Sequence, residues 1–152
     1  LNMDIEPFMV SSTVVSVLAQ RLLRRPCQAC AAPEAPTVGM LRRLGYSPAD
    51  VIGAEFVKGR GCPQCRYTGY KGRAAVLEIL FLDEYLRSAI LDRKASHEIR
   101  NVSMEHSGLV TLLEDGILKA AKGVTTLDEV LRCLPYFNKP RSIAELRRIA
   151  GN

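Results

Sequence analysis

Four of the five cysteines in this 152-residue chain form two pairs with the spacing of a metal site. Each pair has two residues between its members, and two such Cys-x-x-Cys turns present four thiolates to one tetrahedral ion. We therefore predict one bound metal ion, structural zinc (Zn2+), held by Cys27, Cys30, Cys62 and Cys65. Iron in a rubredoxin-like site uses the same four-thiolate geometry and is the chemical alternative.

The predicted metal shell is closed, because cysteine fills all four positions. No position remains for water or substrate, so metal-assisted hydrolysis is not expected. The two pairs are separated by 31 residues, more than the roughly 15 to 20 of common zinc ribbons, so we expect a small subdomain to loop out between them. Glycines that permit positive φ flank the second pair: Gly59, Gly61, Gly69 and Gly72.

Composition indicates a reducing compartment and a modest basic excess. Neither a signal peptide nor a membrane span is readable, and an odd number of cysteines does not suit a disulfide framework, so we expect a cytoplasmic protein. The fifth cysteine, Cys133, lies in an apolar pattern and is interpreted as a core residue. The formal charge of +5 becomes about +3 when four thiolates hold one divalent ion.

Residues for catalysis are not apparent. The chain has no Gly-x-x-x-x-Gly-Lys-Ser/Thr segment and no Gly-x-Gly-x-x-Gly after a strand, so we expect no nucleotide hydrolysis by this chain alone. His97 and His106 fall in a predicted polar helix without a nearby nucleophile. The carboxylates of Glu114 and Asp115 are explained by helix capping. We assign no catalytic and no cofactor-binding residue.

The hydrophobic pattern predicts a mainly helical chain with short strands. Apolar residues at three- and four-residue spacing predict an amphipathic helix from Ser11 to Arg25, with Ser11 or Ser12 as its N-cap. A short helix is expected around 40–44, with strands near 55–58 and 73–80. The metal is expected to fasten the end of the first helix to the strand that begins near Arg73.

The second half of the chain carries helix-start signals. A hydroxyl residue followed three positions later by Glu occurs in three capping-box pairs: Thr111 with Glu114, Thr126 with Glu129, and Ser142 with Glu145. Asp83 and Ser96 are candidate caps for two earlier helices. We expect helices near 84–92, 97–106, 111–122, 126–134 and 142–149. The predicted fold class is α+β, mainly helical.

Several segments together resemble one family, the type II secretion and type IV pilus assembly ATPases. The resemblance covers roughly residues 4–134 and is carried by Val17–Cys27, Gly61–Cys65, Thr68–Arg73, Ala75–Leu80, Leu113–Gly116 and Gly123–Val130. It implies that the parent is a hexameric, RecA-like motor at the bacterial inner membrane. ATP, Mg2+ and the Walker motifs would belong to the part of the parent before Leu1, and the first residue not being Met agrees with a fragment.

The resemblance also implies a domain organisation. Residues 1–26 would be a helix from the end of the motor domain, and 27–73 a zinc-binding subdomain. Residues 74–134 would be a strand and a C-terminal helical domain. The tail 135–152, with a short helix, extends beyond the resemblance and is expected to pack on the domain or to meet a partner.

The leading functional hypothesis is a zinc-binding coupling module of such a motor. Its expected partners are the rest of the motor, neighbouring subunits of a homohexamer, and the inner-membrane platform and recruiting proteins, with nucleic acid not expected among them. A zinc-ribbon nucleic-acid binder is the alternative, because basic and aromatic residues surround one knuckle: Arg60, Arg66, Tyr67, Tyr70, Lys71 and Arg73. An iron electron carrier is the third reading.

Overall fold

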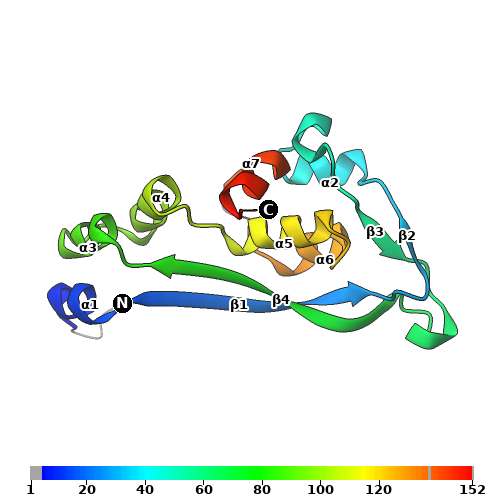
Figure 1. Ribbon diagram of the computed structural model, residues 1–152, viewed down its shortest axis with the longest axis horizontal. Coiled ribbons are helices and arrows are strands. Elements are labelled where there is room, and N and C mark those ends of the chain that lie inside the picture. The colour runs from blue at the N-terminus through cyan, green and yellow to red at the C-terminus, as the bar shows by residue number, and fades with distance from the viewer. Residues whose placement is uncertain (1–4, 137, 152) are drawn as a thin grey trace. The chain divides into compact units, whose positions relative to one another are not determined.

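The computed structural model describes residues 5–136 and 138–151, and Figure 1 shows the order of its elements. Residues 1–4, in the expected N-terminal segment, and 137 and 152, in the tail, lie outside the described residues. Within the described ranges, seven α-helices accompany two sheets of two strands each. The predicted α+β, mainly helical class is confirmed.

The elements follow one another in the order of the labels in Figure 1. The helices are α1 (Pro7–Thr13), α2 (Val38–Arg43), α3 (Glu84–Leu91), α4 (Ser96–His106), α5 (Leu112–Ala121), α6 (Leu127–Cys133) and α7 (Ile143–Ile149). The strands are β1 (Ser16–Pro26), β2 (Ala31–Pro33), β3 (Val57–Gly59) and β4 (Tyr70–Phe81), and two short 3₁₀ helices are η1 (Pro48–Val51) and η2 (Pro63–Cys65). None of the described helices has the length and apolar character needed to cross a membrane.

The prediction of one helix from Ser11 to Arg25 is wrong. The chain is helical only in α1, Ser11 lies inside that helix rather than at its cap, and β1 begins at Ser16. Val14, which caps α1 in an extended conformation, and Val17, which lies in β1, are β-branched and favour extended backbone. Pairing with β4, which is distant in sequence, supplies the hydrogen bonds and overrides the helical spacing of the apolar residues.

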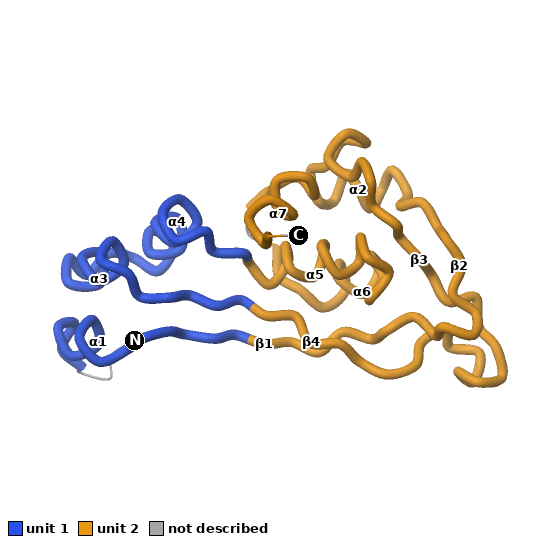
Figure 2. Tube along the Cα trace, viewed as in Figure 1, with its two compact units in different colours: residues 1–19, 78–110 blue, residues 20–77, 111–152 orange. Residues whose placement is uncertain are grey.

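The chain forms two compact units, drawn in different colours in Figure 2. Unit 1 comprises residues 1–19 and 78–110, and unit 2 comprises 20–77 and 111–152. Both β1 and β4 pass from one unit into the other. The strands run in opposite directions, because Leu82 N donates to Val15 O and Cys27 N donates to Gly69 O at the two ends of the pair.

Unit 1 packs three helices around a small core. Helix α3 contacts both α1 and α4, and its Leu86 and Ala89 are buried. Asp83 caps α3 as predicted, by accepting a hydrogen bond from Leu86 N. The predicted cap Ser96 is instead the first residue of α4, whose N-cap is Ala95. Both histidines of α4 are exposed, and the His106 ring stacks on Tyr85 with centroids 4.3 Å apart.

Unit 2 holds the larger apolar core, which the subdomain between the cysteine pairs helps to build. Leu41, Leu44 and Phe56, all from the segment between Cys30 and Cys62, are buried with side chains of α5, α6 and α7. Three threonine or serine caps accept from the predicted partner amides of Glu114, Glu129 and Glu145. The later helices therefore begin where the capping pattern places them.

Candidate metal centre

The first cysteine pair forms a tight turn at the end of β1. Cys27 N donates to Gly69 O at 2.8 Å, which aligns the turn with the start of β4, and Cys30 N donates to Cys27 O at 3.0 Å. Strand β2 begins at the next residue, Ala31. The turn thus follows one strand directly and precedes another, so its two sulfur atoms have a fixed backbone on both sides.

The second pair brackets the short helix η2, with Cys62 as its N-cap and Cys65 as its last residue. Cys65 N and Tyr67 N both donate to Cys62 O, at 3.1 and 2.9 Å. Arg66 and Tyr67 adopt left-handed conformations, with φ of 51° and 61°, which non-glycine residues rarely do. Thr68 Oγ1 closes the turn by donating to Cys65 O at 2.6 Å.

A two-stranded ribbon brings the two pairs together across the long gap in sequence. Strand β2, directly after Cys30, pairs antiparallel with β3, directly before the second turn, with Ala31 opposite Gly59 and Pro33 opposite Val57. Arg60 N extends the pairing by donating to Cys30 O at 3.0 Å. The subdomain of residues 34–56 loops out beyond this ribbon, as the spacing of the pairs predicts (Figure 1).

Two glycines let the backbone of the two turns approach closely. A Cβ at Gly59 would lie 1.9 Å from Gly69 O, and one at Gly69 would lie 2.4 Å from Gly59 O. Gly61 has φ of 92°, and a Cβ there would meet Tyr67 O at 2.8 Å. Any larger residue at Gly59 or Gly69 would separate the backbones that carry the cysteines.

The sulfur positions suit one tetrahedral ion. The Cys27–Cys62 and Cys30–Cys65 Sγ pairs are 3.9 Å apart and the Cys62–Cys65 pair 3.8 Å, and all four Sγ atoms lie within 4.8 Å of one another. Four ligands about 2.3 Å from a zinc ion are about 3.8 Å from each other. Disulfide sulfurs lie about 2 Å apart, so the cluster is a set of thiols arranged for a metal.

Hydrogen bonds prepare one thiolate before any metal is bound. Burial raises the pKa of the Cys30 thiol to about 11. Burial also acts to raise the pKa of Cys65, but amide donors from Cys62 and Gly69, at 3.2 and 3.3 Å from its sulfur, outweigh it and lower that pKa to about 6. Cys65 therefore ionises at a lower pH than Cys30. The soft, four-thiolate set fits zinc and also iron.

A buried carboxylate ties β1 to α6 beside the metal turns. Glu129 is 1% exposed and accepts hydrogen bonds from Arg24 at 2.8 and 3.0 Å and from Arg132 at 2.7 and 2.9 Å. The Arg24 guanidinium also lies 4.1 Å from the ring centroid of Tyr70. Burial acts to raise the pKa of Glu129, but the two guanidinium groups dominate and hold it far below its usual range. We call this set the Glu129 cluster.

A second buried carboxylate holds the tail. Glu114 is 1% exposed, and Arg141 donates to its two oxygens at 2.8 and 2.9 Å. Tyr46 in turn donates to Arg141 O at 2.5 Å. Burial acts to raise the pKa of Glu114, but hydrogen bonds from Arg141 and Thr111 outweigh it and lower that pKa. The described part of the tail therefore packs within unit 2, and Ile143 of α7 is buried in the core of that unit.

The sequence pattern predicted that four cysteines lie together, but it did not predict the two buried carboxylates. The four predicted cysteines come together, whereas Cys133 lies apart from them, partly buried against the core. Glu114 and Glu129 each fit a capping box, and that local pattern explains each glutamate without requiring an ion-pair partner that is distant in sequence. Arg132, three residues after Glu129, is a local signal for one ion pair. Arg24 and Arg141 lie far along the chain from the glutamates that they contact, so the sequence does not identify those two pairs.

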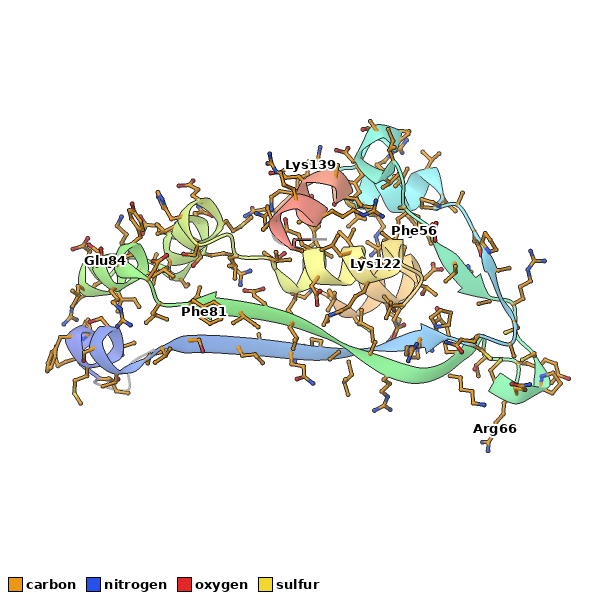
Figure 3. The ribbon with its side chains drawn as sticks, in the orientation of Figure 1. Phe56, Arg66, Phe81, Glu84, Lys122 and Lys139 are labelled. Carbon is orange, nitrogen blue, oxygen red and sulfur yellow. The ribbon has the colours of Figure 1, made fainter. Side chains whose placement is uncertain are left out.

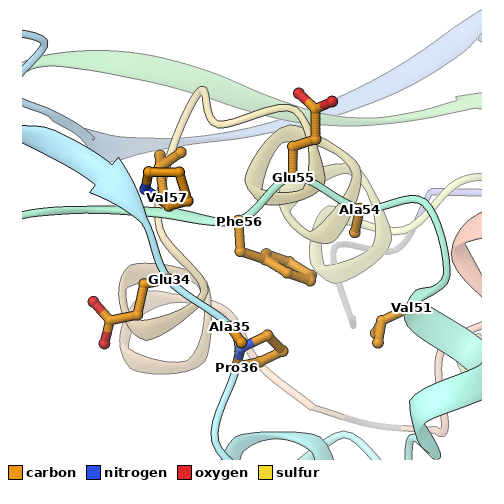
Figure 4. A pocket seen from close by; sticks show the side chains of 9 residues that line it. Glu34, Ala35, Pro36, Val51, Ala54, Glu55, Phe56 and Val57 are labelled. Carbon is orange, nitrogen blue, oxygen red and sulfur yellow. The ribbon is translucent and has the colours of Figure 1, made fainter.

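An apolar pocket of about 620 Å³ lies in unit 2 near the β2–β3 ribbon. Figure 4 shows the Phe56 ring pointing into it, while the carboxylates of Glu34 and Glu55 point away from that ring. Val51 and Ala54 complete the apolar side. No pair of titratable groups converges among the residues that line this pocket, so it offers a hydrophobic surface rather than acid–base chemistry.

The sequence of this chain is similar to those of a known protein family. Residues 1–132 match the family described as "Type II/IV secretion system protein". The chain is 46% identical over 130 residues to the "Type IV pilus assembly ATPase PilB" of Thermus thermophilus, which covers 86% of this chain and 14% of that protein. It is 38% identical over 131 residues to the "Type II secretion system protein E" of Aeromonas hydrophila, covering 86% of this chain and 25% of the relative.

The matches concern only a part of those relatives. A "Type II secretion system protein E" of Pseudomonas aeruginosa is 36% identical over 132 residues, which are 87% of this chain and 26% of that protein. The chain thus spans about a quarter or less of the length of these three relatives. All four clustered cysteines lie within the family match, and α7 lies beyond it.

Proposed function

Because this chain belongs to the type II/IV secretion system protein family, as its resemblance predicted, we propose that it is the metal-braced coupling module of a secretion or pilus-assembly motor. The observation that carries the proposal is the four-cysteine cluster at the meeting point of β1, the β2–β3 ribbon and the start of β4. The cluster lies where several segments need a common anchor.

The residues that would hold zinc are Cys27, Cys30, Cys62 and Cys65. Bound zinc would supply four metal–thiolate bonds and no open coordination position, which favours a structural role over catalysis. The amides of Cys62 and Gly69 stabilise negative charge at the Cys65 sulfur. Arg24 of the Glu129 cluster connects β1 to α6, so a force applied at the turns reaches the helical core through fixed contacts.

The motor chemistry is assigned to the parent protein. The relatives are named as a pilus assembly ATPase and as secretion proteins, so ATP and Mg2+ would act in the full-length parent. In this proposal 1–26 ends the motor domain, 27–73 is the zinc-binding subdomain and 74–134 completes the helical part. The parent would work as a homohexamer on the cytoplasmic side of the bacterial inner membrane, against platform and recruiting proteins.

Replacing two ligands in the full-length parent tests the proposal. We expect Cys62→Ser with Cys65→Ser to remove the metal, measured by elemental analysis, and to abolish secretion or pilus extension, measured in the bacterium. Cys133→Ser is the matched control and should retain both, because Cys133 lies outside the cluster. Normal secretion or extension with a metal-free variant would refute the coupling role. A colourless protein without iron absorption would exclude the iron carrier.

A further inference from the structure

Positive charge is concentrated in the strands and turns around the cysteines. In unit 2, residues 20–33 and 56–77 contain eight Lys or Arg and no Asp or Glu. Since the whole chain has a formal charge of +5, the other residues together have three more acidic than basic side chains. The metal end of unit 2 is therefore a basic region on an otherwise acidic chain.

Most of these cations have no acidic partner among the described residues. Arg24 is engaged by Glu129, and Lys58 pairs with Glu34 and Asp128. The remaining six are exposed and appear in none of the ion pairs of residues 5–136 and 138–151; they are Arg21, Arg25, Arg60, Arg66, Lys71 and Arg73. Figure 3 labels Arg66 on the second metal turn. We call these six side chains the basic surface.

Two recesses give this surface a shape. One, of about 280 Å³, is lined by Arg25, residues of the first metal turn, Gln64 and Lys71. The other, of similar volume, is lined by Arg24, Thr68, Tyr70, Gly72, Arg73 and again Lys71. Lys71 therefore borders both recesses, one of them together with Arg25 and the other together with Arg24 and Arg73. Each recess places two or more cations around a space that a single anionic group can enter.

We propose that the basic surface docks an acidic, carboxylate-rich segment of a partner protein. The guanidinium fork binds a carboxylate through two parallel hydrogen bonds, and arginines predominate among the six cations. Two adjacent recesses that share Lys71 suit successive acidic side chains of one segment. The proposal goes beyond the coupling role, because it concerns what binds this surface rather than what the metal braces.

Other polyanions fit the recesses less well. Single-stranded nucleic acid binds largely by stacking bases on free aromatic rings, but the Tyr70 ring is covered by Arg24 and its hydroxyl lies 3.0 Å from Thr126 Oγ1. Tyr67, which is 75% exposed, lines neither recess. A bilayer surface is flat, so it does not account for the two recesses. The successive acidic side chains of one segment can enter both recesses.

Binding of a labelled glutamate-rich peptide to the metal-loaded protein tests the proposal. We expect binding at low salt that a glutamine-for-glutamate version of the peptide does not show. Lys71→Glu with Arg73→Glu should weaken binding about tenfold or more, because it replaces attraction by repulsion at both recesses. Lys122→Glu with Arg148→Glu makes the same change in net charge at exposed residues outside the basic surface, and should change binding less than about twofold.

Metal content and circular dichroism confirm that both variants are folded, so a loss of binding reports on the surface. Equal losses in the two variants would overturn the proposal, since they would reflect net charge alone. Absence of peptide binding at low salt would overturn it too, as would tighter binding to a DNA oligonucleotide or to vesicles containing anionic phospholipid. These measurements use purified protein and can fail while the metal-braced motor role stands.

Discussion

The metal end of unit 2 and its helical core are held by different forces. In the core, apolar side chains from α2, α5, α6 and α7 form one buried cluster. Residues 59–69, which carry the second metal turn, contribute no side chain to that cluster. There the contacts are backbone hydrogen bonds, sulfur atoms and two glycines in close approach. One region is held by burial of apolar side chains, and we expect the other to depend on a metal bound by the four cysteines.

A metal bound by the four cysteines would order the turns in place of an apolar core. Burial of apolar surface contributes about 25 cal/mol per Å² in a core, but the metal turns expose the side chains of Gln28, Gln64 and Arg66. Metal–thiolate bonds order such turns without a core, as they do in small zinc-dependent folds. Removing the metal should therefore destabilise the metal end of unit 2 and leave its helical core ordered.

Metal removal should give the largest effect and confine it to one region. Cys62→Ser is expected to lower the free energy of unfolding of the metal end by on the order of 5 kcal/mol, a part of the roughly 10–16 kcal/mol that zinc supplies in small zinc-dependent folds. In hydrogen exchange, the amides of Cys27 and Arg60, which bond across the turns, should lose protection. The amides of α5 should keep their protection from exchange. An equal loss of protection in α5 would contradict the expectation that the two regions are stabilised independently.

Gly59→Ala tests the close backbone approach rather than the metal bonds. The new methyl group would meet Gly69 O at 1.9 Å, so the turns must move apart, at a cost of about 3 kcal/mol. Weaker zinc binding in a competition titration and a lower urea midpoint should follow. Gly39→Ala is the control, because its Cβ has no contact shorter than 3.8 Å and its φ is not positive. Similar losses in both variants would rule out the proposed clash.

The sequence predicted those features that depend on local spacing. The Cys-x-x-Cys turns and the capping boxes each need only a few neighbouring residues, so the four clustered cysteines and the helices from Asp83 onward could be located. Strand β1 could not be located, because its pairing with β4 is a long-range contact, and Leu18 and Leu22 have helical spacing yet are exposed in the strand.

The buried ion pairs show the same limit in another form. Arg24 falls near the end of the helix expected from Ser11 to Arg25, but it lies in β1 and donates to Glu129 of α6, 105 residues later. The tail is expected to pack on the domain or to meet a partner, but the pattern does not show that its Arg141 binds Glu114 at the start of α5. A local pattern already explained each glutamate, and only the fold could supply its distant partner.

Glu129→Gln tests whether the core side depends on its buried charge. The substitution leaves Arg24 and Arg132 without their carboxylate, and breaking a fully buried pair costs about 3–5 kcal/mol. Both guanidinium groups are about half exposed, at 44% and 59%, so water compensates partly and we expect about 2 kcal/mol. Urea unfolding measures the loss. Glu105→Gln, at an exposed position of α4, should change the free energy of unfolding little. An equal loss of stability in that variant would contradict a stabilising role of the Glu129 cluster.

The smallest expected effect is the pH dependence that Glu114 contributes to the tail. Its folded-state pKa lies below the usual value because of Arg141 and Thr111, so its stabilisation is present above the unfolded-state pKa of about 4.3 and is lost as pH falls toward the folded value. Thiolate protonation also destabilises the metal end in acid, so the informative quantity is a difference between variants. The urea midpoint of Glu114→Gln should lie below that of the unaltered protein at pH 7. The gap should narrow below pH of about 4, and a gap independent of pH would show that Glu114 acts through packing rather than charge.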